Sequence, residues 1–250
     1  MHHSENPNIK QFFPLVIKSI SKGMEALSND NSNYSASAIE QYAQNVFSRV
    51  VEIDNSFKNL SITIEYLRQE AYKDSNYSFS EHHAHHIENF LLRLTSVVDR
   101  SYKLAGSTIM MKNSHIDRQG SNQKIDKKLL ENYPFSAAIL EDMRNTIKEI
   151  RKYRNKVAHQ AGFSNENLCV LQAIENAGIE SISVKEITDI MPYDKIKEVV
   201  SDESIEQYES VLLGIDKLVT DLINSLSFVY TGLLQSQARP SQILCNCHLD

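Results

Sequence analysis

Apolar residues recur at steps of three and four along several long stretches of the chain, which is the spacing of one buried face on an α-helix. The first stretch runs from Ala36 to about Lys73 without proline or glycine, and it predicts one long helix or two nearly continuous ones. Its apolar positions are Ile39, Tyr42, Val46, Val50, Ile53, Phe57, Leu60, Ile64, Leu67 and Ala71.

Three further stretches show the same spacing. The second runs over 80–106, with Ser80 expected as the N-cap and Gly106 as the stop. The third starts near Ser136, ends near Gly162 and carries an apolar stripe, and the fourth runs over 204–233. The stripe of the third stretch consists of Ile139, Met143, Ile147 and Ile150. Long amphipathic helices with short connections predict an all-α fold, an antiparallel helical bundle.

The segments between these stretches carry weaker patterns. Residues 107–134 are predicted to be a long exposed loop, with a short helix near Ile125 to Glu131. Residues 164–200 break around glycine and proline and predict an irregular insertion, with a small strand at Ile182 to Val184. We therefore expect a single helical domain over 1–250, with its core at about 36–162 and 203–236 and a loose tail at 239–250.

Composition and charge agree with this interpretation. The chain has 7 glycines and 5 prolines, residues that helix interiors avoid. Its formal net charge of −6 excludes a protein that coats nucleic acid over most of its surface. Three cysteines without a disulfide framework favour a cytoplasmic location, and the lack of a long apolar run predicts no membrane partner.

Positive charge is concentrated between Arg144 and His159. This stretch holds six basic residues and one acidic residue, a local charge of +5 that attracts an anionic ligand. At about 100° per residue, the side chains at 151, 155 and 159 fall on the same side of a helix as Arg154. A purely structural interpretation is also open, in which Arg154 pairs with a carboxylate on a neighbouring helix and His159 stabilises the helix C-terminus.

The segment Arg154-Asn155-Lys156-Val157-Ala158-His159 resembles the Arg-x4–6-His motif of the HEPN superfamily. It also lies near the end of a predicted core helix, where that superfamily carries the motif. The resemblance implies a HEPN-type bundle that forms a homodimer, with two copies of the motif facing each other across a cleft. Many members are metal-independent endoribonucleases without a cofactor, often toxins or defence effectors.

The same resemblance implies roles for the residues of the motif. His159 would transfer protons while the RNA 2′-hydroxyl attacks the adjacent phosphate, leaving a 2′,3′-cyclic phosphate. Arg154 would hold the phosphate and offset its growing charge, and Asn155 would orient the phosphate or the imidazole.

Other residues are expected to assist. Arg151, Lys152 and Lys156 are candidates for binding the RNA backbone. Asp99 is a candidate acid partner for the motif, with Arg100 beside it, although an ordinary structural ion pair is the alternative for both.

Further alternatives stay open. The chain would be a non-catalytic helical module if the basic cleft binds a nucleotide or a partner without turnover. His82 and His86, four residues apart, have metal-ligand spacing, so a histidine-dependent metal protein is a third hypothesis. Apart from Glu81 and Glu88, no acid or cysteine at a clear spacing completes a site, and a solvated helix start without a metal is the expected state. An antitoxin protein is a further expected partner, although Ala161 stands where one toxin subclass carries a tyrosine that its partner nucleotidyltransferase modifies.

Overall fold

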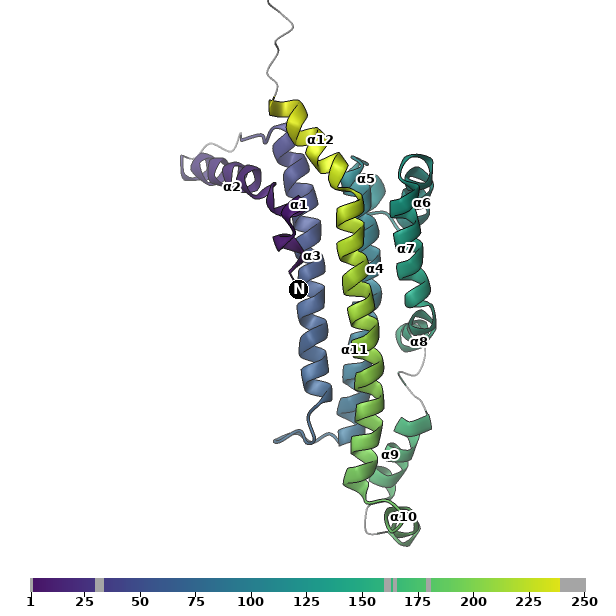
Figure 1. Ribbon diagram of the computed structural model, residues 1–250. Coiled ribbons are helices and arrows are strands. Elements are labelled where there is room, and N and C mark those ends of the chain that lie inside the picture. The colour runs from purple at the N-terminus through teal and green to yellow at the C-terminus, as the bar shows by residue number, and fades with distance from the viewer. Residues whose placement is uncertain (1, 30–33, 160–162, 164–165, 179–180, 239–250) are drawn as a thin grey trace, which may run out of the picture. The chain divides into compact units, whose positions relative to one another are not determined.

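The computed structural model describes residues 2–29, 34–159, 163, 166–178 and 181–238, without the side chains of 154, 156–159, 166, 237 and 238. Within these residues the chain forms helices and no strand, which confirms the all-α helical bundle (Figure 1). The helices are the 3₁₀-helix η1 (His3–Glu5), α1 (Pro7–Lys10), α2 (Phe13–Ser28), α3 (Ala38–Leu67), α4 (Phe79–Thr108), α5 (Asn113–Ile116), α6 (Ser121–Asn132), α7 (Pro134–Thr146), α8 (Lys148–His159), α9 (Glu166–Ala177), α10 (Ile182–Thr188), α11 (Tyr193–Ser225) and α12 (Ser227–Ala238).

Capping boxes mark the starts of two long helices. At α3, the Glu40 carboxylate accepts from the Ser37 amide at 2.9 Å, and the Ser37 hydroxyl accepts from the Glu40 amide at 3.4 Å. These hydrogen bonds, with the Lys22 ammonium at 3.1 Å, lower the pKa of Glu40 to about 2. Ser78 and Glu81 form the same reciprocal pair at α4. The cap of α4 is therefore Ser78 rather than the predicted Ser80.

The described residues group into two compact units. Unit 1 draws on 1–54, 99–141 and 218–250, and unit 2 on 55–98 and 142–217. Residues of the long helices α3, α4 and α11 are divided between the units. Within the described part of the chain, no helix is both long and apolar enough to cross a bilayer.

In unit 1 the first half of α3 runs antiparallel to the end of α4. The Tyr42 hydroxyl donates to the Thr108 carbonyl at 3.0 Å, and Arg100 lies 3.2 Å from Glu52, so residue numbers rise along one helix as they fall along the other. Beyond the sequence prediction, the N-terminal segment also belongs to this unit. The carboxylate of Asp54 accepts from the amides of residues 3 and 4 at 2.7 and 3.0 Å.

Residues 107–134 are not the long exposed loop that the sequence predicted. They form α5 and α6, whose residues Ile116, Ile125 and Leu129 are fully buried. The expected short helix near 125–131 is confirmed and extends over Ser121–Asn132. Gly106 does not end α4 but lies inside it, where an added Cβ would come within 3.2 Å of Ile116 and Ile125. The glycine thus allows close packing instead of stopping the helix.

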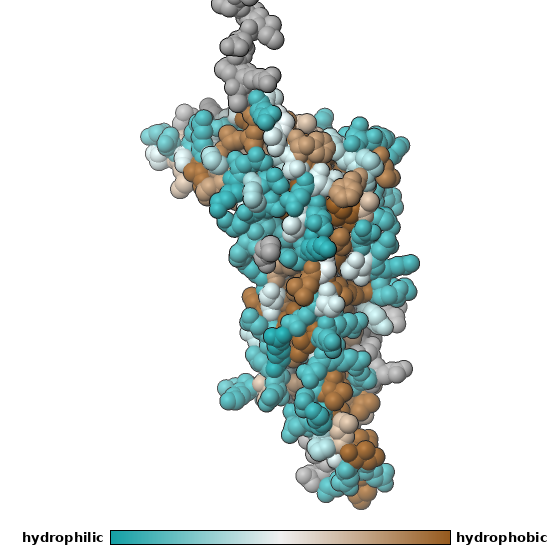
Figure 2. All heavy atoms as spheres, in the orientation of Figure 1, coloured by the Kyte–Doolittle hydropathy of each residue, from teal (hydrophilic) through white to brown (hydrophobic). Residues whose placement is uncertain are grey.

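Residues 164–200 are likewise not an irregular insertion wherever the structure describes them. In unit 2, α9, α10 and the start of α11 share a small core of Leu171, Ile174, Val184, Ile196 and Val200. The predicted strand at Ile182 to Val184 is wrong: these residues begin α10, and the Ser181 hydroxyl caps it by accepting from the amide of residue 184. Tertiary packing therefore overrides the β-propensity of the isoleucine and valine. Exposed apolar residues also gather over α10 at the lower end of the view in Figure 2.

The predicted loose tail at 239–250 lies outside the described residues.

Candidate functional site

The basic stretch spans two helices of the structure rather than one. The predicted helix from Ser136 ends at Thr146 as α7, and α8 begins at Lys148 after a break at Ile147. The predicted apolar stripe is confirmed, because Ile139, Met143, Ile147 and Ile150 are all buried. Gly162, the predicted end, lies outside the described residues, and the described helix ends at His159.

The described polar residues of α8 lie partly in solvent. Lys152 and Asn155 are exposed, and Arg151 is half-buried with contacts of its own. The Lys152 ammonium lies 2.8 Å from Glu149 and lowers the pKa of that carboxyl. Such an exposed pair contributes little net energy, so Lys152 can exchange Glu149 for another anion.

The side chains of Arg154, Lys156 and His159 lie outside the described part of the structure. The backbone of the whole motif is described, and it is helical from Lys148 to His159. Arg154 and Asn155 therefore occupy successive helical positions, and His159 lies four residues beyond Asn155, one turn along the helix. The roles assigned to these residues stay predictions.

The segment after α8 is attached to α4 within unit 2. The amide of Phe163 donates to the Glu88 carboxylate at 2.6 Å, and the Phe163 ring lies 6.3 Å from that of Tyr153 on α8. Sequence reasoning did not predict this anchor, since nothing in the spacing links residues 88 and 163. The contact fixes the position of Phe163 against α4.

The two proposed supporting residues lie in unit 1, whereas α8 lies in unit 2. Asp99 accepts a hydrogen bond from the Asn122 amide group at 2.9 Å, and Arg100 pairs with Glu52 at 3.2 Å. Both also have further interactions. The contacts of Arg100 agree with an interhelical ion pair, and a supporting role at the motif stays a prediction for both residues.

The histidines at the start of α4 stack on tyrosines. The Tyr72 ring lies 3.9 Å from that of His82 and 5.7 Å from that of His86, whose own separation is 6.3 Å. The ring of Tyr66 also stacks on that of His86, with 5.0 Å between the ring centres. The planes of these stacked ring pairs differ by 10–26°. Within the described residues, no group of three or more histidine, cysteine or acidic side chains could hold a metal ion.

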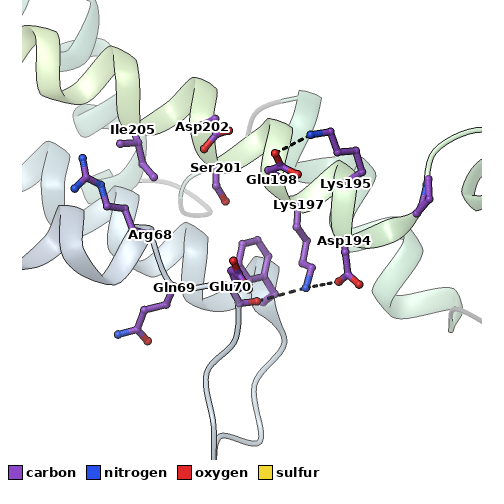
Figure 3. A pocket seen from close by; sticks show the side chains of 12 residues that line it. Arg68, Gln69, Glu70, Asp194, Lys195, Lys197, Glu198, Ser201, Asp202 and Ile205 are labelled. Atoms are coloured by element: carbon purple, nitrogen blue, oxygen red, sulfur yellow. Dashed lines mark hydrogen bonds and ion pairs between the residues drawn. The ribbon is translucent and has the colours of Figure 1, made fainter.

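Unit 2 also contains a cavity of about 550 Å³ that sequence reasoning did not predict (Figure 3). Its lining comes from the turn after α3, the start of α4 and the start of α11, and includes Arg68, Glu70, Phe79, Lys197 and Asp202. The ammonium of Lys197 lies 2.8 Å from Asp194 and 5.4 Å from the centre of the Phe79 ring. The cavity therefore presents cations and carboxylates together, without a bias toward an anionic ligand.

No protein-family model, curated protein or solved structure matches this chain. The functional assignment consequently depends on the residues themselves.

Proposed function

We propose that this protein is a metal-independent endoribonuclease of HEPN type that acts as a homodimer through Arg154 and His159. The observation that carries the proposal is the Arg-Asn-x-x-x-His motif on a helix, α8, that continues through its last residue. The exposure of Asn155 and the local charge of +5 over 144–159 support an anionic substrate at this helix.

The proposed reaction needs a proton-transfer group and a fixed cation. His159 removes the proton from the RNA 2′-hydroxyl, whose oxygen attacks phosphorus while the bond to the 5′-oxygen breaks. Arg154 binds the phosphate and offsets the charge that grows on it. In a homodimer a second copy of His159 is available to protonate the leaving 5′-oxygen. The products are a 2′,3′-cyclic phosphate and a 5′-hydroxyl.

Charge distribution limits where RNA binds. The chain as a whole carries −6 although residues 144–159 carry +5, so the remaining surface repels a polyanion. RNA contacts should therefore be confined to α8 and its neighbourhood, with Arg151, Lys152 and Lys156 as backbone-binding candidates. RNA binding through these basic side chains should weaken as the salt concentration rises. Binding releases counterions from the RNA, and this release is less favourable when the salt concentration in solution is higher.

The test is cleavage of mixed RNA by purified protein in EDTA. We expect His159→Ala to lower the cleavage rate by at least about 100-fold, the usual contribution of a proton-transfer residue. His85→Ala removes an exposed histidine of α4 and should leave the rate unchanged. Equal cleavage by wild type and His159→Ala would contradict the proposal.

A different outcome would identify the non-catalytic alternative. In that outcome the wild type binds RNA or a nucleotide, Arg154→Ala does not, and the wild type cleaves none of the RNAs tested. The chain would then be a binding module. If the enzyme is active, its expression in cells can be compared with that of His159→Ala. Growth arrest by the wild type but not by the variant would support a toxin or defence role and justify a search for an antitoxin protein.

A further inference from the structure

Helix α2 of unit 1 presents a row of large apolar side chains to solvent. They recur at steps of four and three, so they lie within about 40° of one line along the helix. Their exposed fractions range from 45% to 74%. The row consists of Phe13, Ile17, Ile20, Met24 and Leu27.

The opposite side of α2 is held against the rest of unit 1. Val16 and Ser19 are buried, and the Ser19 hydroxyl accepts from the Gln44 amide group at 2.9 Å. The Lys22 ammonium reaches Glu40 on α3 at 3.1 Å. Because these contacts fix the orientation of α2, the apolar row is a second face of an already packed helix.

The row has no charged residue beside it. Pro14, Ser21 and Gly23 border it, and Lys18 and Glu25 lie more than about 100° away around the helix. A helix that binds a membrane surface typically carries several lysines or arginines next to its apolar face. The lack of charge at the borders of the row therefore favours another apolar protein surface over a lipid surface as its binding partner.

We infer that α2 is a self-association surface, on which the α2 helix of a second copy of this chain packs around a two-fold axis. At ~150–200 Å² for a large side chain, the exposed fractions give about 500 Å² of apolar surface per chain. Two copies bury about 1,000 Å², the lower limit for a specific interface. A two-fold axis lets the same row serve both chains, so no other complementary surface is needed.

This inference is independent of the proposed ribonuclease activity. The residues of α2 belong to unit 1, and those of α8 belong to unit 2. An interface near this lower limit is typical of weak, reversible association, for which we expect a dissociation constant of about 1–100 µM.

The experiment is sedimentation equilibrium of the full chain across about 1–300 µM, a range that brackets this constant. We expect the average mass of the wild type to rise with concentration above that of Ile20→Lys and Met24→Lys, which keep at most the dimer that the proposed function places at α8. Ile190→Lys places the same charge at a position of unit 2 that is 86% exposed, and it should associate like the wild type. Circular dichroism melting shows whether each variant remains folded.

The inference would be overturned by a wild type whose average mass matches that of both α2 variants over the whole range, whether the three proteins keep one mass or associate alike. It would also be overturned by binding to anionic vesicles that is lost in Met24→Lys while the wild type associates no further than the variants. RNA cleavage is measured on the same variants, because it tests the proposed function separately. Cleavage lost only in His159→Ala, with association intact, would show that the two properties are distinct.

Discussion

Replacing Phe12 by alanine is expected to lower the free energy of unfolding by about 3–5 kcal/mol. The side chain is completely buried, and its ring meets those of Tyr42 and Tyr230 edge to face at 5.7 and 5.5 Å. Truncation removes these contacts and leaves a cavity between segments far apart in the sequence. Urea denaturation followed by circular dichroism measures the change, with the slope of the transition reporting whether unfolding remains cooperative.

The neighbouring Phe13 provides a matched control. It carries the same side chain but is 47% exposed, so Phe13→Ala should cost less than about 1 kcal/mol when measured at a concentration below that at which α2 associates. Similar losses for the two variants would show that the N-terminal segment does not pack as described. A negligible loss of stability for both variants would show that residues before 36 lie outside the cooperative fold. This is the result expected from the sequence prediction, in which the core begins at about residue 36.

The long helices were predictable because each repeats its apolar spacing over many turns. Val46, Val50 and Ile53 on α3 fall where the pattern predicts a core, and all three are buried. Over such lengths, packing of a continuous apolar face outweighs local preferences. The all-α fold follows from this signal alone.

The short helices were not predictable by the same reasoning. In α6 only Ile125 and Leu129 mark a buried face, too few positions to separate a helix from a polar loop. The contact that makes the segment favourable is distant in sequence, the close approach to Gly106. In the same way Asp54 holds the amides of His3 and Ser4 across some fifty residues, which no local pattern reveals.

For the candidate site, the sequence supplied the motif and the chemistry, and the structure supplied the local environment of its described residues. A motif within six residues can be recognised because its spacing is local. The cavity of Figure 3 cannot, because Arg68 follows α3, Phe79 begins α4 and Lys197 lies on α11, and only the fold brings them together. The stacking of His82 on Tyr72 likewise arises where the chain turns from α3 into α4.

Acid is expected to destabilise the protein through His83, by about 3 kcal/mol between pH 6.5 and 4. The residue is completely buried beside Phe79, and within the described residues neither ring nitrogen has a hydrogen-bond partner. Burial, and secondarily the nearby His86, lower the pKa of His83 from 6.5 to about 4. In this interval the unfolded chain binds a proton that the folded chain does not, so stability falls as the pH decreases and levels off below about 4.

Leucine has a volume similar to that of histidine, and His83→Leu removes both the titrating imidazole and its two unpaired nitrogen atoms. The variant should therefore be more stable than the wild type at pH 5, by about 2 kcal/mol. His85→Leu introduces the same side chain on an exposed position of α4 and should keep the wild-type pH dependence. Urea unfolding of all three proteins between pH 4 and 8 provides the comparison, because the acid titration of other groups is common to them. A pH dependence that is unchanged in His83→Leu would mean that the imidazole is protonated inside the fold, with a partner that satisfies its charge.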